Sequence, residues 1–218
     1  VYQVEWGKVM DDIVLIGGGG HAKVLISIIK KSRQFNIIGY LDLVDKRDVL
    51  GVKYLGLDNK LESLTTAGLK IAAMGIGKID CSELRMNVVS NILKYKIKFP
   101  PIISKDCIIN ESVKVNKGVQ VFDGAIINSG SVLSEYCIIN SKALVEHDCS
   151  IGKFTHIAPG VTISGNVTIG SNVLLGAGSI LIQGINICDN VVIGAGSVVV
   201  RDIVESGIYV GNPCRRIG

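Results

Sequence analysis

The chain has 218 residues, of which 48% are hydrophobic and only 5% aromatic. Its net charge of +4 is too mild and too dispersed to indicate a nucleic-acid-binding protein. No apolar run approaches the ~18 residues that a membrane span requires, and the opening segment lacks the apolar stretch of a secretory signal. The six cysteines show no CxxC spacing. We therefore expect a cytoplasmic protein with reduced thiols and no metal site.

The N-terminal part of the chain alternates between strand and helix patterns. Residues 1–10 are expected to be a leader that lies outside both domains. Within residues 11–100 the sequence predicts strands over 12–17, 36–42, 52–55, 70–77 and 96–99, and helices over 21–31 and near 82–94. This alternation predicts a small Rossmann-like parallel sheet.

A glycine-rich loop joins the first predicted strand to the first predicted helix. Residues 17–22 read GGGGHA and fit GxGxxA, a pattern in which backbone N–H groups hold a phosphate at a helix N-terminus. Asp42 ends the second strand, where an acidic residue commonly meets a ribose hydroxyl. Because the domain holds only one mononucleotide-binding half, a nucleotide-diphosphate sugar fits better than a dinucleotide. The alternatives are glycines that serve tight packing alone and an Asp42 that is merely a solvated strand end.

The C-terminal part, residues 101–218, is dominated by a six-residue repeat. Every sixth residue from Ile103 to Val199 is Ile, Leu or Val, and the residue four positions later is always small or β-branched. Gly, Asn and Asp gather between these positions, where tight turns need φ > 0. Three hexads make one coil of 18 residues, and stacked strands lie ~4.8 Å apart. The repeat therefore predicts a triangular parallel β-helix, with Cys107, Cys137 and Cys149 as small core residues.

The histidines carry the chemical signal of the repeat region. His147 occupies a turn position, so it points away from the dry interior, and Asp148 follows it. Imidazole, with an unperturbed pKa of ~6.5, suits the removal of a proton from an amine nucleophile. No cysteine occupies an equivalent exposed corner, so a covalent intermediate on a thiol is not favoured. Gly165 lies one coil after His147, where its bare backbone leaves room beside the imidazole and offers an N–H to an oxyanion. Alternatively, Gly165 only permits a turn with φ > 0.

Three segments together resemble a known family. They are the GGGGH loop, the run VEHDCSIGKFTHIAPGVTISGNVTIG and the ending YVGNPCRRIG. The chain resembles the bacterial hexapeptide-repeat sugar O-/N-acetyltransferases over nearly its whole length from Ile13. This family includes UDP-4-amino-sugar N-acetyltransferases of bacillosamine synthesis, perosamine N-acetyltransferases and sialic-acid O-acetyltransferases. The resemblance implies a left-handed β-helix, acetyl-CoA as co-substrate, and a homotrimer whose acetyl-CoA groove lies between adjacent prisms.

The resemblance also implies roles for individual residues. It implies that His147 is the general base and that Asp148 is its acidic partner, at a position where the family often has Glu. The implied acetyl-CoA contacts are His156, Gly165, Ala177 and Ala195. The implied contacts to the acceptor or its nucleotide are Gly19, Gly20, His21, Asp42 and Asn140.

These observations predict an acetyl-CoA-dependent N-acetyltransferase. Its expected acceptor is the amino group of a nucleotide-linked amino-deoxy sugar, above all a UDP-4-amino-4,6-dideoxy sugar, and its product would enter surface polysaccharide or glycan biosynthesis. One alternative is O-acetylation of sialic acid or a related sugar. Another is a nucleotide-sugar-binding solenoid without catalysis.

Overall fold

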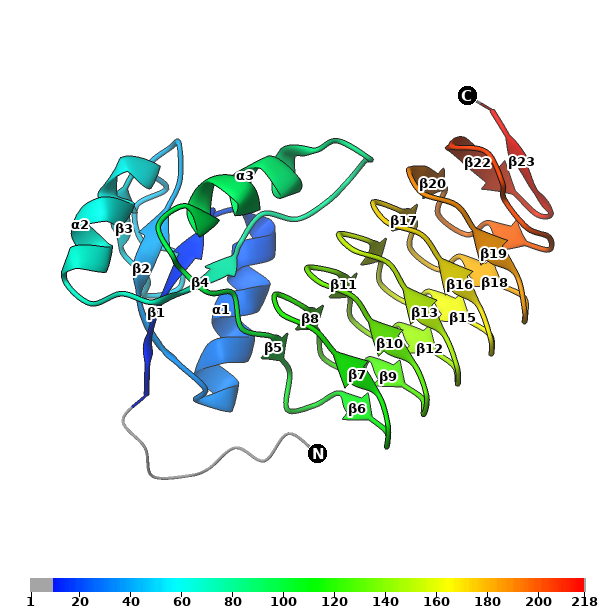
Figure 1. Cartoon of the computed structure of the whole chain (residues 1–218), viewed down its shortest axis with the longest axis horizontal. Coiled ribbons are helices and arrows are strands. Elements are labelled where there is room, and N and C mark those ends of the chain that lie inside the picture. The colour runs from blue at the N-terminus through cyan, green and yellow to red at the C-terminus, as the bar shows by residue number, and fades with distance from the viewer. Residues whose placement is uncertain (1–9, 218) are drawn as a thin grey trace. The chain divides into compact units, whose positions relative to one another are not determined.

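The computed structural model describes residues 10–217, so residues 1–9 of the expected leader lie outside the described residues. The chain forms two compact units (Figure 1). The first unit holds residues 10–77 and 83–105, and the second holds residues 78–82 and 106–217. This division differs from the expected boundary after residue 100. The 78–82 segment belongs to the second unit because its polar groups bond to the β-helix.

The first unit contains a parallel sheet whose strands lie in the order β3-β2-β1-β4. The bounds of these strands are β1 Asp12–Ile16, β2 Asn36–Leu41, β3 Tyr54–Gly56 and β4 Ile71–Met74. The central strand β1 is buried from Ile13 to Ile16, as expected for a strand that is covered on both faces. The predicted small parallel sheet is confirmed.

Helices connect these strands. They are α1 Gly20–Ser32, the 3-10 turn η1 Asp58–Lys60, α2 Leu61–Thr66 and α3 Leu84–Leu93. Helix α1 buries Leu25, Ile26 and Ile29 and ends at Arg33, which adopts the left-handed conformation and donates its N–H to Ile29 O. The sequence did not predict α2 because a helix of six residues is too short to show helical periodicity.

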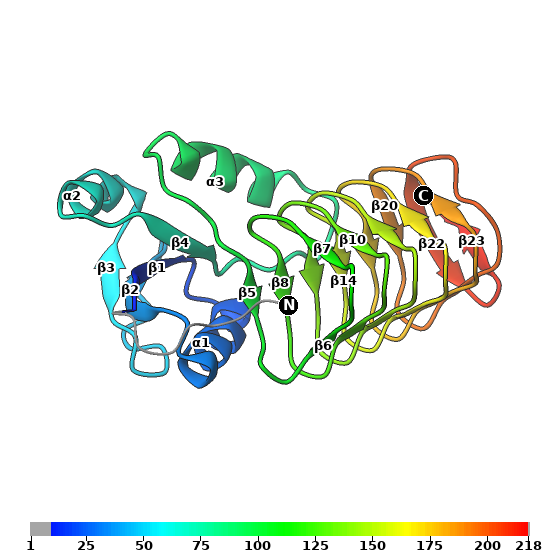
Figure 2. The same cartoon turned by 60° about the horizontal axis from the view of Figure 1, so that its bottom comes forward.

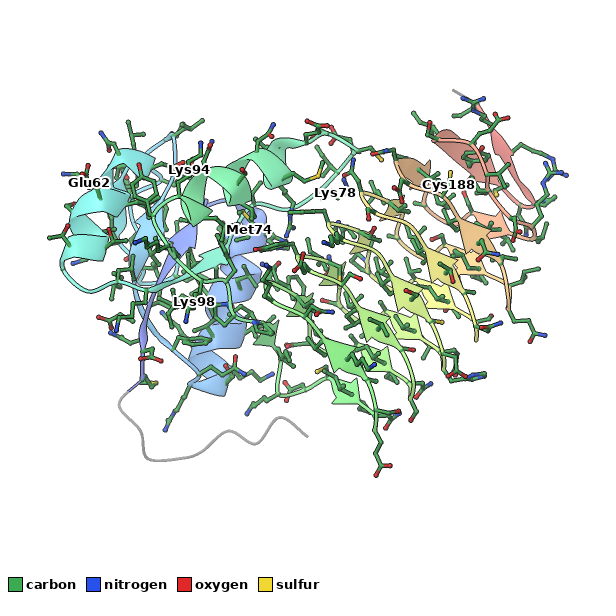
Figure 3. The ribbon with its side chains drawn as sticks, viewed as in Figure 1. Glu62, Met74, Lys78, Lys94, Lys98 and Cys188 are labelled. Atoms are coloured by element: carbon green, nitrogen blue, oxygen red, sulfur yellow. The ribbon has the colours of Figure 1, made fainter. Side chains whose placement is uncertain are left out.

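The strand that the sequence predicts over 96–99 does not form. Lys96 has φ = 58°, which turns the chain instead of extending it. Only Lys98, which is labelled in Figure 3, makes an isolated parallel bridge, to Ile71. The short strand β5 Ile102–Ile103 follows. The residue types of this segment did not reveal the turn at Lys96, so the predicted strand was wrong.

The second unit is a left-handed parallel β-helix with three faces (Figure 2). Face 1 contains β8 Gln120–Val121, β11 Ile138–Ile139, β14 His156–Ile157, β17 Leu174–Leu175, β20 Val191–Ile193, β22 Gly207–Gly211 and the antiparallel β23 Cys214–Arg216. Face 2 contains β6 Ile108–Ile109, β9 Ile126–Ile127, β12 Leu144–Val145, β15 Thr162–Ile163, β18 Ile180–Leu181 and β21 Val198–Val199. Face 3 contains β7 Lys114–Val115, β10 Val132–Leu133, β13 Ser150–Ile151, β16 Thr168–Ile169 and β19 Asn186–Ile187.

The interior of the β-helix is formed by the two predicted series. The aliphatic residues at every sixth position are buried from Val121 to Val199, and the small residues four positions later are buried from Val119 to Ile203. Neighbouring strands pair with a shift of one coil, as Ile138 with His156 and Leu144 with Thr162 show. The coil length of 18 residues that the repeat predicts is confirmed. Cys137 and Cys149 are buried, as the repeat predicts, whereas Cys107 is half-buried.

The corners of the β-helix share one backbone conformation. Every sixth residue from Ser112 to Gly196 has a positive φ. Most of these residues are Gly, Asn or Asp, which adopt this region at little cost. Tyr136 and Phe154 also adopt it, and their stacked rings lie 4.9 Å apart on consecutive coils. The sequence did not predict bulky residues at corners, and ring stacking accounts for this pair.

Residues 10–217 lack two features. None of their helices is both long and apolar enough to cross a membrane. In the same range, no group of three or more His, Cys, Asp and Glu side chains is arranged to hold a metal ion.

Candidate active site

His147 lies in the turn that carries the chain from face 2 to face 3. Its side chain is 62% exposed, and its Nδ1 lies 2.9 Å from Asp148 Oδ2. Asp148 has φ = 58°, and this corner conformation turns its carboxylate toward the preceding imidazole. A carboxylate only accepts hydrogen bonds, so Nδ1 carries the proton. The lone pair of neutral His147 is therefore on Nε2, as a general base requires.

Gly165 lies under the His147 imidazole, one coil further along. A Cβ at Gly165 would come within 2.6 Å of His147 Nε2, a separation that heavy atoms do not tolerate. Gly165 is not among the residues with positive φ, and the left-handed corner is formed by Asn166, with φ = 57°. The explanation that Gly165 only permits a turn is therefore wrong. The glycine is needed because the imidazole occupies the space of a side chain.

The backbone of Gly165 offers one unused donor. Its carbonyl accepts the Gly184 N–H at 3.0 Å, whereas no acceptor within residues 10–217 bonds its own N–H. The N–H groups of Ser129 and His147, at the same position of the two preceding coils, are likewise without an acceptor in that range. An open N–H is thus a feature of this turn. Gly165 differs from Ser129 and His147 because the His147 imidazole, the candidate base, lies over it.

A polar ladder leads to the residue before His147, and the sequence did not predict it. Asn110 Nδ2 donates to Asn128 Oδ1 at 2.6 Å, and Asn128 Nδ2 donates to Glu146 Oε2 at 2.9 Å. The Glu146 carboxylate is thereby held beside the base. The three positions are spaced by one coil, so stacking of polar residues at an interval of 18 was the signal that could have identified them.

A second group of site candidates is centred on His156, on face 1. His156 is 8% exposed, and its Nδ1 donates to Lys78 O at 2.8 Å because a carbonyl can only accept. Asn140 Oδ1 accepts the Ser141 N–H at 2.8 Å, so Asn140 Nδ2 is the atom that faces His156 Nε2 at 3.0 Å. His156 is therefore the Nδ1–H tautomer with both ring nitrogens engaged.

This network defines what each residue can offer to a ligand. With its Nε2 lone pair accepting from Asn140, His156 has no N–H left for a ligand. No other acceptor within residues 10–217 bonds the second N–H of the Asn140 amide. Asn140 is thus the member of this pair that can donate to a ligand, and His156 orients it.

Ala177 and Ala195 lie at the corner between face 1 and face 2, on consecutive coils. The Gly196 N–H donates to Ala177 O at 2.9 Å, which fixes their stacking. Both alanines are exposed. At the neighbouring corner positions Gly160, Gly178 and Gly196, an added Cβ would meet nothing within 4 Å. The corner is therefore an unobstructed strip of small residues, which fits a long thin chain such as pantetheine.

In the first unit, Asp42 holds the glycine loop. Its Oδ2 accepts the Gly18 N–H and Lys46 Nζ, each at 2.7 Å, and its Oδ1 accepts the Val44 N–H at 3.2 Å. Burial alone would raise the pKa of this carboxyl, but the hydrogen bonds from Lys46, Gly18 and Val44 and the charge of Lys46 together lower the pKa below its ordinary value. Asp42 is therefore not a solvated strand end.

The glycines of this loop divide into two kinds. At Gly17 and Gly18 a Cβ would collide, at Gly18 within 2.5 Å of the Tyr40 ring, so these two serve close packing. Gly20 has nothing within 4 Å of an added Cβ, and Gly19 has only Lys46 Nζ, at 3.9 Å. The backbone at Gly19 and Gly20 is thus open at the start of α1, next to an ammonium group. His21 follows in the first turn of that helix.

The chain is similar to known proteins over both units. Residues 12–92 match the PglD N-terminal domain, and residues 166–201 match the hexapeptide repeat of succinyl-transferase. PerB from Caulobacter crescentus, in complex with CoA and GDP-perosamine, is 32% identical with a TM-score of 0.90, over 96% of this chain and 99% of that chain. The acetyltransferase domain of PglB from Neisseria gonorrhoeae FA1090, in complex with acetyl coenzyme A, is 30% identical with a TM-score of 0.89, over 96% and 100%.

The chain belongs to the hexapeptide-repeat sugar acetyltransferase family. It is an acetyl-CoA-dependent sugar acetyltransferase, and a variant of the Caulobacter crescentus perosamine N-acetyltransferase, at 33% identity, places it with the N-acetyltransferases. No curated protein matches the sequence significantly. Family membership sets aside the alternative of a solenoid without catalysis.

The cysteine nearest to the base of this acetyltransferase is poorly suited to carry an acetyl group. Cys149 is 1% exposed, and its Sγ lies 3.2 Å from Ser164 O and 3.6 Å from His147 O. Burial, the largest effect, raises the pKa of the thiol, and the nearby carboxylates of Glu146 and Asp148 raise it further. A thiol that resists ionisation is a weak nucleophile.

The β-helix of this acetyltransferase holds its candidate residues in two separate groups. His147, Asp148 and Gly165 lie at the corner between face 2 and face 3. Asn140, Ala177 and Ala195 lie at the corner between face 1 and face 2, and His156 lies on face 1. In a triangular cross-section the first corner is opposite face 1. A single β-helix therefore does not bring together the residues expected to contact acetyl-CoA.

Proposed function

We propose that the enzyme transfers an acetyl group from acetyl-CoA to the amino group of a nucleotide-linked amino-deoxy sugar, with a UDP-4-amino-4,6-dideoxy sugar as the expected acceptor and His147 as the general base. The observation that carries this proposal is the orientation of His147. Its Nδ1–H is committed to Asp148, and its Nε2 lies over a glycine where no side chain can compete for the lone pair.

The chemistry follows from these positions. His147 Nε2 takes a proton from the attacking amine while a C–N bond forms at the thioester carbonyl carbon. Asp148 stabilises the resulting imidazolium. In this proposal the Gly165 N–H donates to the oxyanion of the tetrahedral intermediate. When the C–S bond breaks, the imidazolium returns the proton to the departing CoA thiolate, which leaves His147 neutral for the next turnover.

Transfer is direct in this proposal. A covalent route needs a nucleophile near the base, and Cys149 is buried with a raised pKa. We expect that incubation with acetyl-CoA alone adds no acetyl group to the protein, as intact mass spectrometry would show. A Cys149→Ala variant should keep kcat within about twofold, because deletion of a sulfur from a small core site changes packing more than chemistry.

The acceptor's nucleotide is proposed to lie on the glycine loop. The open backbone at Gly19 and Gly20, the first turn of α1 with His21, and Lys46 Nζ together form a positive site that fits a diphosphate. Asp42 is already committed to Gly18 and Lys46, so its main role in this proposal is to hold the loop and the ammonium in place.

The enzyme is proposed to be a homotrimer. Face 2 presents an apolar stripe whose outward residues include Ile108, Ile126, Leu144 and Ile180, and two of these, Ile108 and Ile180, are 54% and 43% exposed. The two corners that hold the separate residue groups flank this face. When the threefold axis lies in front of face 2, the corner that carries His147 in one copy meets the corner that carries Asn140 in the next copy. That arrangement buries the stripe and completes three sites.

The proposal is tested by following release of the CoA thiol with a panel of acceptors. The panel contains UDP- and GDP-linked 4-amino-4,6-dideoxy sugars, the same amino sugars without a nucleotide, the matching nucleotide-linked 4-hydroxy sugars, and sialic acid. We expect turnover with a nucleotide-linked amine and none with its hydroxyl counterpart. Turnover confined to hydroxyl acceptors would replace N-acetylation by O-acetylation, and turnover with the free amino sugar at an equal KM would contradict a nucleotide site.

A further inference from the structure

The 78–82 segment is joined to the β-helix by a buried hydrogen-bond network that the mechanism above does not use. Lys78 and Asn172 are 7% and 5% exposed. Lys78 Nζ donates to Asn172 Oδ1, Asn172 Nδ2 donates to Cys81 O at 2.8 Å, and Cys81 Sγ donates to Asn172 O at 3.1 Å. Asn172 lies at the corner between face 3 and face 1, so this network fixes the 78–82 segment along one edge of face 1 (Lys78 is labelled in Figure 3).

The same segment reaches the candidate site through one backbone atom. Lys78 O accepts the His156 Nδ1–H, and His156 Nε2 accepts the Asn140 Nδ2–H. The contacts thus form a continuous chain from Asn172 through Lys78 and His156 to Asn140. One end of this chain is a buried structural tie, and the other end is a residue proposed to contact the acceptor.

The Lys78 carbonyl decides which atoms Asn140 presents. Without this acceptor, His156 can carry its proton on Nε2, which then faces Asn140 Nδ2 donor to donor. The amide cannot turn over to relieve this, because the Ser141 N–H holds Asn140 Oδ1 at 2.8 Å. Loss of the carbonyl therefore displaces the Asn140 side chain and its second N–H. An unmatched buried pair of donors is unfavourable enough to drive such a displacement.

We infer that Lys78 and Asn172 are positioning residues for acetyl transfer, which fix the tautomer of His156 and thereby the direction of the Asn140 amide. The inference rests on the proposed function only in giving Asn140 a contact with the acceptor. The tautomer of His156 is independent of that assignment and can be measured on the enzyme without substrates.

The test uses Asn172→Gly. Asn172 has φ = 59°, a conformation that glycine adopts without strain, so the substitution removes the amide and leaves the corner intact. Asn190→Gly is the matched control. Asn190 lies at the same corner one coil further along, has φ = 58°, and bonds to Asn172 rather than to the 78–82 segment. Lys78→Met is a second variant, which removes the ammonium and keeps the chain length of the side chain.

Two readouts are combined. Nitrogen-15 NMR of labelled histidine, with the signal assigned by His156→Gln, should show a single Nδ1–H tautomer of His156 in the wild type and a mixture in Asn172→Gly and Lys78→Met. In both variants kcat/KM for the acceptor should fall about tenfold, the loss expected for one hydrogen bond. The Kd for acetyl-CoA should stay within about twofold. Asn190→Gly should match the wild type in every measurement.

The outcomes separate the inference from the proposed function. A wild-type tautomer in both variants, or an altered tautomer with unchanged kcat/KM, overturns the positioning role while acetyl transfer stands. If the wild type acetylates no amino sugar, the proposed function fails, and the tautomer signal of the free protein still decides whether the network controls His156. If Lys78→Met is too unstable to study, Asn172→Gly decides alone.

Discussion

Few contacts hold the His147 side chain in place. Its imidazole is 62% exposed, and Asp148 is its one polar side-chain partner within residues 10–217. His147→Ala should therefore leave the melting temperature unchanged within error and lower kcat by about 10²–10⁴, the usual contribution of a general base. Stopped assays of thiol release and a thermal melt check both expectations.

Asp148→Asn is a milder substitution that can be compared with His147→Ala. Asp148→Asn keeps a residue that accepts φ = 58° readily and an oxygen that can still face His147 Nδ1–H, but it loses the charge that stabilises the imidazolium. We expect a smaller loss of kcat than for His147→Ala. If Asp148→Asn lost more activity than His147→Ala, the assignment of His147 as the base and Asp148 as its partner would be contradicted.

Gly165 allows the geometry of the site to be tested separately from backbone strain. A Cβ at Gly165 would lie 2.6 Å from His147 Nε2, while Gly184 and Gly196 have φ = 72° and 67° and nothing within 4 Å of an added Cβ. Gly165→Ala should lower kcat at least tenfold with little loss of stability. Gly184→Ala and Gly196→Ala should each lose about 1 kcal/mol of unfolding free energy. Gly184→Ala, which lies outside the strip of small residues at Ala177 and Ala195, should also keep kcat.

The opposite pattern would place the acetyl group elsewhere. If Gly165→Ala lost stability as Gly184→Ala does and kept normal turnover, the imidazole would not depend on this glycine. Melting temperature and initial rate, measured on the same preparations, distinguish the two patterns because one reports on the fold and the other on the position of Nε2.

A contact between two site residues could be predicted from the sequence only where it follows the repeat of the β-helix. The stacking of Gly165 on His147 follows from the interval of 18 alone, and the same interval links Asn128 to Glu146. Lys78 could not be predicted in this way. Its contact with His156 spans 78 positions and joins a connecting segment to a repeat, so no periodicity reveals it.

Among the elements, the glycine loop depends on a carboxylate at the end of β2. The folded-state pKa of Asp42 is lowered, so its contribution to stability is present above the ordinary value of 3.8 and is lost as the pH falls through the lower folded value. Asp42→Asn should cost about 1–3 kcal/mol of unfolding free energy at pH 7, as expected for hydrogen bonds to a charged group. It should also raise the acceptor KM while the KM for acetyl-CoA stays unchanged.

Denaturation of the wild type and Asp42→Asn between pH 7 and pH 3 tests this sign. The difference between them should be constant down to about pH 4 and should shrink below it. A difference that grows as the pH falls would mean that Asp42 is not an ionised partner of Gly18 and Lys46.

The elements also show where sequence patterns stop being informative. Strands of the β-helix were predicted because each aliphatic residue is buried at a fixed interval. The segment 96–99 has similar composition and no such interval, and a left-handed Lys96 ends it as a turn. Tyr136 and Phe154 adopt corner conformations that their residue types disfavour, because stacking across coils outweighs a local preference that is read one residue at a time.

For the whole molecule, the resemblance implied an acetyl-CoA groove between adjacent prisms, and the β-helix divides the residues implied to contact acetyl-CoA between two corners. Position within a hexad tells which residues point outward, but the identity of the corner depends on counting strands around the three faces. The apolar stripe on face 2 was likewise hidden, because its outward residues, such as Leu144 and Ile180, alternate with aliphatic core residues in the same two-residue strands.

Complementation between two inactive variants tests whether sites form between copies. His147→Ala removes the base from one corner, and Asn140→Ala removes the amide from the other, so each variant alone should have little activity. In co-expressed mixtures with equal amounts, one interface in four pairs an intact His147 from one copy with an intact Asn140 from the next. Random assembly should therefore restore about one quarter of wild-type activity.

Leu144→Glu, which puts a charge on the apolar stripe, should abolish both the assembly and the recovery of activity, as light scattering and rate measurements would show. If the mixture is no more active than the sum of its parts while light scattering shows mixed trimers, each site lies within one chain and the proposed arrangement about face 2 is wrong.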